Sequence, residues 1–351
     1  MGENFILLLF VMLPIVLLIF TRQFFRQVRP QMSGQRIRSL VFGNTLVLLL
    51  LLSVLTLGGE VYFRFFYDST DSFGLCKTTQ RWFARHFERN ATGFRDSANY
   101  MPTVEPGKRR VSFFGDSITA AHGIADVEDR FANIIRATNP NLEIHVLAQC
   151  GLDTGKQLEL VHFLPESGYE TDIVVLVYFL NDISDITPEW QEIGKRLYES
   201  PSPGFLVSNS YLFDTINARL RMAREPGVSD YYSFVRDAYE GSVWDRQKDR
   251  LTNFRDTVAA NGGTFYVVTF PFLHALGDDY AYRDIHKKLN SLWLDLDVPH
   301  LDLLRVFEGM DAEDLVVSSR DAHPNESAHA LAAREISTFL VEQIESEPGS
   351  E

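Results

Sequence analysis

The chain has 351 residues, of which 45% are hydrophobic and 23% are charged, and this balance excludes a disordered or fibrous protein. It carries 33 basic and 47 acidic residues, which gives a formal net charge of −14 at pH 7. So acidic a chain repels phosphate backbones, and we expect no nucleic-acid partner.

Two long apolar runs lie near the amino terminus. Residues 5–20 hold no charged side chain, and residues 40–57 are interrupted only by Gly43 and a few small polar residues. Each run is close to the roughly 20 residues that a helix needs to cross a bilayer core. We expect residues 1–59 to be a membrane anchor with transmembrane helices at about 5–21 and 40–58. A cleaved signal peptide is the competing interpretation of the first run, but Glu3 and the lack of Lys or Arg before it argue against that.

The segment between the two runs is rich in arginine. It contains Arg22, Arg26, Arg29, Arg36 and Arg38. Positively charged loops stay on the cytoplasmic side of a membrane. Both chain ends are then expected to face outward, with the anchor in a bacterial inner membrane and the rest of the chain in the periplasm.

Residues 60–110 are expected to form a juxtamembrane segment rich in aromatic side chains, followed by a linker that contains prolines and a glycine. The two cysteines are Cys76 and Cys150. In an oxidising compartment they could form a disulfide or remain separate thiols, and the sequence leaves both alternatives open.

The rest of the chain, residues 111–345, alternates short apolar runs with amphipathic segments. This alternation is typical of an α/β domain in which helices cover both faces of a parallel sheet. The almost uninterrupted apolar run at 173–180 indicates a strand that is buried on both sides. The expected strands are 111–115, 142–147, 173–180, 264–270 and 298–304, and the expected helices are 130–138, 156–164 and 326–344, the last with Leu331, Ile336 and Leu340 on its buried face.

Residues 184–262 do not follow this alternation. The segment is long and aromatic, and it is expected to be an insertion of helices and loops between two strands of the sheet. Long insertions are often functional, so this one could be a lid over a substrate or an ordinary decorating subdomain.

Polar residues and glycines follow the predicted strands. The carboxyl ends of parallel strands meet at one edge of a sheet, where open α/β folds place their ligands. Residues from distant parts of the chain are therefore expected to converge there. They are Gly115-Asp116-Ser117 after the first strand, Gly151 after the second, Asn181-Asp182 after the third, and Asp321 with His323 before the last helix.

These residue types suit acyl transfer through a serine, which needs a base, a group that orients the base, and donors for the oxyanion. Ser117 would be the nucleophile, His323 the base and Asp321 the group that orients it. The backbone amides of Ser117 and Gly151, with the carboxamide of Asn181, would form the oxyanion hole. Each residue also has a plainer interpretation as a cap or turn residue.

Taken together, the four blocks resemble the SGNH (GDSL-type) hydrolases, a family named for a serine, a glycine, an asparagine and a histidine in separate blocks. The matches are Gly115-Asp116-Ser117-Ile118-Thr119, Gly151, Asn181-Asp182, and Asp321 with His323, in family order. The resemblance implies a three-layer α/β/α fold of the flavodoxin-like kind, no metal or other cofactor, and chemistry on esters. Asp116 and Asp182 would be supporting residues.

The chain departs from the family pattern at three places. Phe179 stands where the third block usually has glycine, Gln149 where the second commonly has asparagine, and Asp321 is two residues before His323 instead of three. None of these changes removes a group that the chemistry requires. The histidines nearest the blocks, His122 and His329, are expected to be surface or packing residues.

The function expected from this resemblance is a membrane-anchored serine esterase or acyl hydrolase outside the cytoplasm. Its substrate would be an ester, such as an acetyl or other acyl group on a carbohydrate or lipid of the cell envelope. Two alternatives remain open: an O-acyltransferase that modifies envelope polysaccharide through the same acyl-enzyme, and a non-catalytic, membrane-tethered binding or assembly protein.

Overall fold

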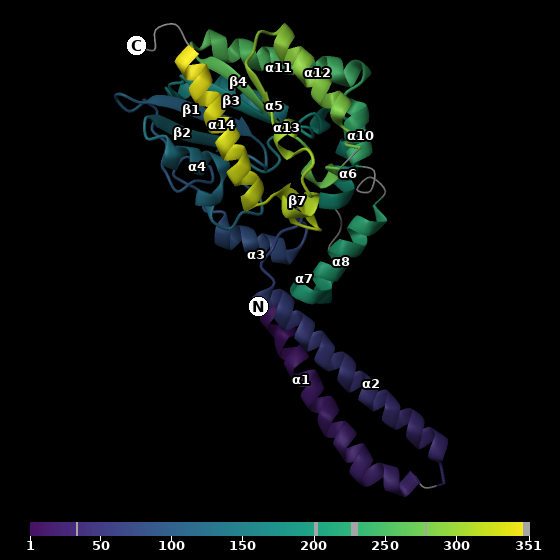
Figure 1. The fold of residues 1–351 in the computed structure, drawn as a ribbon. Helices are drawn as coiled ribbons and strands as arrows, with labels where there is room; N and C mark the ends of the chain where they lie inside the picture. Colours follow the sequence, from purple (N-terminus) through teal and green to yellow (C-terminus); the bar gives the residue numbers. More distant parts are fainter. Residues whose placement is uncertain (33, 200–202, 226–230, 278, 347–351) are drawn as a thin grey trace. The chain divides into compact units, whose positions relative to one another are not determined.

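The computed structural model describes residues 1–32, 34–199, 203–225, 231–277 and 279–346 (Figure 1). They form two compact units. The first combines Met1–Ser69 with Leu75–Arg81 and Leu197–Arg224, and the second comprises the rest of the described chain. The domain bounds expected from the sequence stay a prediction, since compactness alone does not establish independent folding.

The first unit contains the apolar helices α1 (Gly2–Gln23) and α2 (Arg36–Val61), which run side by side. Together with the short helical turns that continue them, η1 (Phe24–Val28), η2 (Arg29–Met32) and η3 (Tyr62–Phe66), they form two stretches of 31 residues with mean hydropathies of 2.7 and 2.4. Both stretches are long and apolar enough to cross a bilayer. The unit also contains α7 (Phe205–Asn209) and α8 (Tyr211–Arg224).

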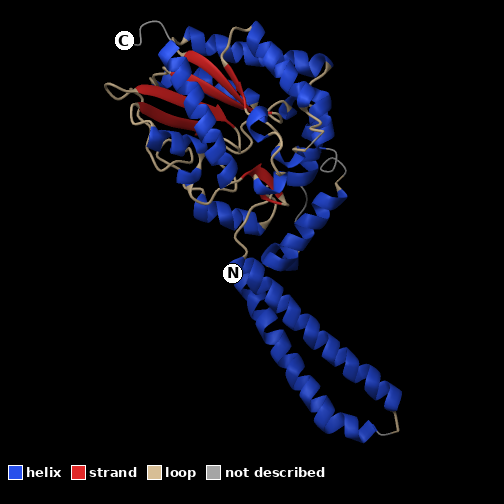
Figure 2. Cartoon of the chain, in the orientation of Figure 1, coloured by secondary structure: helices blue, strands red, loops and turns tan. Residues whose placement is uncertain are grey.

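The second unit is built on a parallel sheet of five strands in the order β2-β1-β3-β4-β5 (Figure 2). Every residue of the central strand β3 is buried, as the apolar run predicts. This order confirms the flavodoxin-like α/β fold class. The strands are β1 (Arg109–Gly115), β2 (Leu142–Ala148), β3 (Ile173–Phe179), β4 (Thr264–Phe270) and β5 (His300–Asp302).

Helices cover both faces of the sheet because the chain reverses direction after β2. The crossover from β1 to β2 uses α4 (Phe131–Thr138), whereas the crossovers to β3 and β4, in the opposite direction, use α5 (Thr154–Phe163) and α11 (Gly241–Ala260). Right-handed crossovers in opposite directions place their helices on opposite faces. Accordingly, α4 packs against α14 (Glu326–Ser346) on one face, and α5 packs against α11 on the other.

The remaining elements connect this framework. The antiparallel pair β6 (Val316–Ser318) and β7 (Asp321–Pro324) precedes α14. The other helices of the described chain are α3 (Lys77–His86), α6 (Pro188–Tyr198), α10 (Tyr231–Ala238), α12 (Arg283–Asp295) and α13 (Leu304–Phe307), with short turns η4 (Val127–Asp129), η5 (Pro165–Ser167), η6 (Ser184–Ile186), η7 (Leu273–Ala275) and η8 (Ala312–Asp314).

The buried face of α14 differs in part from the predicted one. Ile336 and Leu340 are fully buried, as predicted, but Leu331 is only half-buried. Ala332 and Phe339 complete the face instead. Small alanine side chains allow helices to pack closely. The apolar pattern of the sequence does not mark them as buried, because alanine is only weakly hydrophobic.

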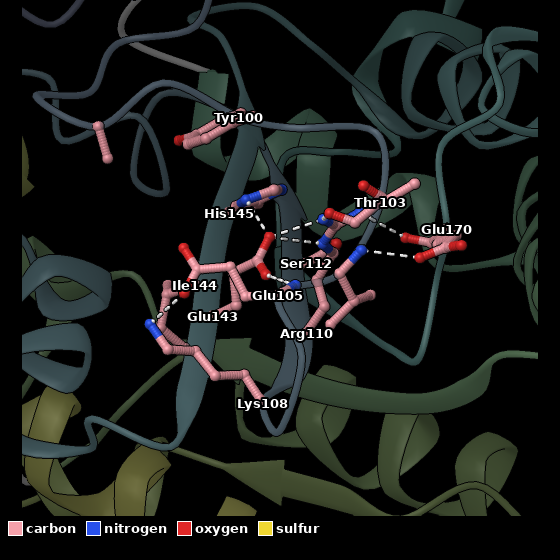
Figure 3. A network of polar contacts seen from close by, with 12 residues as sticks. Tyr100, Thr103, Glu105, Lys108, Arg110, Ser112, Glu143, Ile144, His145 and Glu170 are labelled. Atoms are coloured by element: carbon pink, nitrogen blue, oxygen red, sulfur yellow. Dashed lines mark hydrogen bonds and ion pairs between the residues drawn. The ribbon is translucent and has the colours of Figure 1, made fainter.

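A buried arginine ties together the segments at the amino end of the sheet (Figure 3). Arg110 in β1 is fully buried, and its guanidinium donates to Glu143 Oε1 of β2 at 2.6 and 3.0 Å. It also donates to the backbone carbonyls of Pro102, Thr103 and Glu170 at 2.6–2.9 Å. The linker before β1 and the loop before β3 are therefore held to one cation.

Replacing this arginine should destabilise the second unit. Arg110→Ala removes the guanidinium from three carbonyls and from the Glu143 carboxylate, so we expect the free energy of unfolding to fall by about 3–5 kcal/mol. Lys108→Ala is the matched control, since its 2.7 Å pair with Glu105 is exposed and worth about 1 kcal/mol or less. Urea denaturation of the detergent-solubilised chain compares the two. Equal losses would mean that the buried network contributes no more than a surface pair.

Candidate active site

The residues singled out at the strand ends come together at the carboxyl edge of the sheet. β1 lies between β2 and β3, with Gly115 in register with Ala148 on one side and Val177 on the other. The turns that follow these strands carry Ser117, Gly151 and Asn181. Ser117 lies in a turn and not at the start of a helix, which excludes its alternative interpretation as a helix cap.

Glycine is required at position 115 by close packing. A Cβ atom there would lie 2.1 Å from Thr119 Oγ1 and 3.0 Å from the carbonyl oxygen of Val177 in β3. Contacts this short are not tolerated, so only glycine lets the chain turn directly out of the strand. The turn that places Ser117 at the sheet edge depends on this residue.

Ser117, His323 and Asp321 form a continuous chain of hydrogen bonds. His323 Nε2 lies 2.8 Å from Ser117 Oγ, and His323 Nδ1 lies 2.5 Å from Asp321 Oδ1. Ser117 and His323 are 206 residues apart in the sequence. The strand β7 carries both Asp321 and His323 and so brings the carboxylate and the imidazole to the serine together. With the Nδ1 proton donated to Asp321, Nε2 is left to accept the serine proton.

The one-residue-shorter spacing of Asp321 and His323 does not prevent this contact. The two residues alternate along β7 with Ala322 between them, and the backbone N–H of His323 also donates to Asp321 Oδ1 at 3.1 Å. The carboxylate therefore folds back onto both the backbone and the ring of the histidine.

The charges of this chain are set by burial and by one another. Burial opposes the charged form of His323, but the carboxylate of Asp321, with Asp116 and Asp71 further away, raises the pKa of the imidazole above its ordinary value. Burial likewise favours neutral Asp321, yet His323 and His122 hold the pKa of that carboxyl well below its ordinary value. The pair is an imidazole that protonates readily beside a carboxylate that stays ionised.

A second histidine, His122, reaches the carboxylate of Asp321, although the sequence pattern predicts a surface or packing residue at this position. The ring of His122 stacks on that of His323, with centroids 4.0 Å apart and planes 6° from parallel. His122 Nε2 lies 3.3 Å from Asp321 Oδ2 and 3.1 Å from the carbonyl of Asp71. Thr70 donates its hydroxyl to the same Oδ2. Asp321 is thus held from three sides.

The turn that carries His122 is fixed by a buried arginine. Arg95 is 1% exposed, and its guanidinium donates to the carbonyls of Ala121 and Ile124 at 2.5 and 2.6 Å. Ala121 itself has a φ of +60°, a left-handed conformation that the arginine contact helps to hold. A fixed turn keeps the His122 ring against its partner.

The two supporting aspartates are both buried. Asp116 Oδ2 lies 3.2 Å from Ser117 Oγ, and Asp116 Oδ1 accepts the backbone N–H of Ile118 at 2.9 Å. Asp182 Oδ2 accepts the backbone N–H of Phe179 at 3.2 Å, which closes the turn after β3. Burial raises the pKa of both carboxyls, and the nearby Asp116 raises that of Asp182 further.

Asn181 lies in the turn after β3, and Gly151 lies in the turn after β2. Asn181 follows the end of β3, half-buried, and its Oδ1 atom is buried and has no hydrogen-bond partner in the described structure. The Tyr231 hydroxyl of α10 interacts with the same side chain. Gly151 has a φ of +75°, which favours glycine, and nothing lies within 4 Å of where its Cβ would be.

Three of these groups could also be considered as metal ligands. Ligand atoms of His122, Asp321 and His323 lie within 4.8 Å of one another. However, hydrogen bonds already engage both ring nitrogens of His323 and both oxygens of Asp321. Each of these atoms is therefore accounted for by a hydrogen bond among the described residues. Cys150 next to Gly151 has an exposed, free thiol.

The sequence matches no family model and no curated protein. Among solved structures, it is similar to a lipolytic protein of the G-D-S-L family from Veillonella parvula, with 12% identity, a TM-score of 0.42, and coverage of 68% of this chain and 100% of that one.

Two further structures have similar values. The esterase EstA from a Pseudoalteromonas species has 13% identity and a TM-score of 0.43, over 68% of this chain and 100% of its own. An extracellular lipase from Streptomyces rimosus has 13% identity and a TM-score of 0.40, over 65% of this chain and 99% of its own. The backbone overlap with each is partial, and the chemistry of the site has to be inferred from its own geometry.

Proposed function

We propose that this chain is a serine hydrolase that cleaves an ester through an acyl-enzyme. The observation that carries the proposal is the relay in which Asp321 holds His323 at 2.5 Å and His323 holds Ser117 at 2.8 Å. A buried serine, an imidazole and an ionised carboxylate in that order suit nucleophilic attack on an acyl carbon. A membrane-tethered binding protein would have no need of such a relay.

In the proposed reaction, Ser117 Oγ bonds to the acyl carbon while His323 Nε2 takes the hydroxyl proton. The tetrahedral oxyanion is stabilised by the Asn181 carboxamide and the amides of Ser117 and Gly151. Collapse of this intermediate breaks the ester bond, and His323 returns its proton to the leaving alcohol. Water then attacks the acyl-enzyme with His323 as base and releases the acid. Asp321 remains ionised throughout, and Asp116 and Asp182 support the turns.

We further propose that α1 and α2 cross a membrane and that the catalytic unit lies outside the cytoplasm. The apolar length of both helices supports the first part. The arginines at and between the facing ends of the two helices support the second part, since positive loops stay on the cytoplasmic side. An ester on an envelope carbohydrate or lipid is the substrate class that such a location makes accessible.

Covalent labelling tests whether the serine is a nucleophile. A fluorophosphonate probe should modify the membrane-bound chain at Ser117, because His323 raises the nucleophilicity of that oxygen alone. Peptide mass spectrometry locates the adduct. Ser117→Ala should abolish labelling, whereas Ser167→Ala, a substitution on the exposed turn η5, should leave it unchanged. An intact chain that takes no label at Ser117, while a control hydrolase is labelled, would support the non-catalytic alternative.

Removal of the Asn181 side chain tests the oxyanion hole. Asn181→Ala should lower kcat by roughly 10²- to 10³-fold with little change in KM, since the donor acts mainly in the transition state. Steady-state hydrolysis of an aryl acetate gives both constants. Asn253→Ala on the exposed side of α11 is the control for the same substitution and should retain wild-type kinetics. Full activity of the folded Asn181 variant would remove this residue from the mechanism.

The raised pKa of His323 predicts where activity is lost in acid. Only the neutral imidazole accepts the serine proton, so kcat/KM should fall as the pH drops through a midpoint above the ordinary imidazole value of about 6.5. In Asp321→Asn the carboxylate that raises the pKa is gone. Its midpoint should shift to lower pH, and kcat should drop as well. A wild-type midpoint below pH 6, with substrates of two acyl lengths, would contradict the assignment of His323.

A further inference from the structure

The short helices α7 and α8 expose an apolar surface that is unusual for a soluble segment. Phe205 and Leu206 of α7 are 60% and 43% exposed, and Ile216 and Leu220 of α8 are 42% and 47% exposed. On α8, Leu212, Ile216 and Leu220 follow one another at intervals of four residues and therefore line one side of the helix. This surface, defined by Phe205, Leu206, Ile216 and Leu220, is called the α7–α8 face below.

The same two helices pack against the apolar helices of the first unit. The Phe205 ring lies 6.3 Å from that of Phe5, and the Phe213 ring lies 6.0 Å from that of Phe10. Leu212 lies over Gly59 of α2, where a Cβ atom would meet the leucine methyl groups at 3.0 and 3.1 Å. The α7–α8 face is thus continuous with the surfaces of α1 and α2.

A buried ion pair fixes the start of α8 to the end of α2. Glu60 is fully buried, and its carboxylate pairs with Arg64 at 2.7 Å. It also accepts the Ser210 hydroxyl at 2.6 Å and the backbone N–H groups of Tyr211 and Leu212 at 3.2 and 3.0 Å. These amides are the free donors at a helix start, and a carboxylate suits them. The position of α8 within this unit is therefore specified by polar contacts as well as by packing.

The contacts also set the depth of the first turn of α8 along the apolar helices. Glu60 comes directly after the apolar run 40–57 and the glycine pair Gly58 and Gly59, which places it at the edge of a bilayer core. Phe10 lies five residues inside the run that begins at Phe5, or about 7–8 Å at 1.5 Å per residue. Helices that lie in a membrane interface bury their apolar side about 5–10 Å deep.

We propose that α7 and α8 form a helix pair embedded in the outer interface of the membrane, with the α7–α8 face buried among phospholipid acyl chains. The anchor would then consist of two spanning helices and a third, interfacial element supplied by the chain between β3 and β4. The bilayer is the occupant that these contacts support, because this face continues two helices long enough to span one. The inference rests on the proposed membrane location of α1 and α2.

Site-directed spin labelling tests the proposal in the full chain, reconstituted into nanodiscs of phosphatidylcholine and phosphatidylglycerol. In a Cys150→Ser background, nitroxides are placed at Ile216→Cys and Leu220→Cys. Oxygen concentrates in lipid, whereas a nickel chelate stays in water. At both sites, the collision rate of the nitroxide with oxygen should therefore exceed its collision rate with the nickel chelate. Leu48→Cys within α2 serves as the lipid reference, and Leu294→Cys, 81% exposed on α12 of the other unit, serves as the water reference.

The outcomes separate this proposal from the one on which it rests. Lipid-like values at positions 48, 216 and 220 support an interfacial α7–α8 face. Lipid-like values at 48 with water-like values at 216 and 220 overturn it while leaving the anchor in place. Labels at 216 and 220 that neither reagent reaches would show a protein partner on this face and would also overturn it. Water-like values at position 48 would refute the membrane anchor itself.

Discussion

The geometry of the candidate site depends on one buried carboxylate. Asp321 is fully buried, and a charge in such a position is stable only if donors surround it. His323, His122 and Thr70 provide them, and they come from β7, from the turn after β1 and from a segment before the sheet. The need to satisfy this carboxylate therefore draws three distant parts of the chain to one point, and the orientation of the His323 ring follows from it.

The same logic recurs at the other buried charges of the second unit. Arg95 and Arg110 are almost fully buried, and each donates largely to backbone carbonyls of loops. One holds the turn that carries His122, and the other holds the segments at the opposite end of the sheet. The two guanidinium groups therefore fix the positions of loops around the parallel sheet, although the desolvation of each charge is itself unfavourable.

Much of this arrangement was predictable from the sequence because it is local. The five strands follow from apolar runs, and the positions of Ser117, Gly151 and Asn181 follow from the rule that ligands bind at the carboxyl ends of parallel strands. His122 was missed because its approach to His323 depends on a left-handed residue at Ala121 and on Arg95, and neither feature has a periodic signal. Thr70 was missed for a related reason: it is 251 residues from its partner. A histidine five residues after a candidate nucleophile is the one signal that could have pointed to the first.

The place of α8 in the chain has a consequence for synthesis. The ribosome makes β3 first, then α8, and only afterwards β4. The helix α8, which belongs to the same unit as the hairpin of α1 and α2, therefore emerges before the fourth strand of the sheet. Completion of the sheet and assembly of the hairpin are interleaved in time. A shortened chain that begins at the first strand would keep Leu212 and Phe213 but lose Gly59 and Phe10, against which they pack. Such a fragment would carry an exposed apolar surface into solution, and a water-soluble version of the chain requires redesign of α8 as well as deletion of α1 and α2.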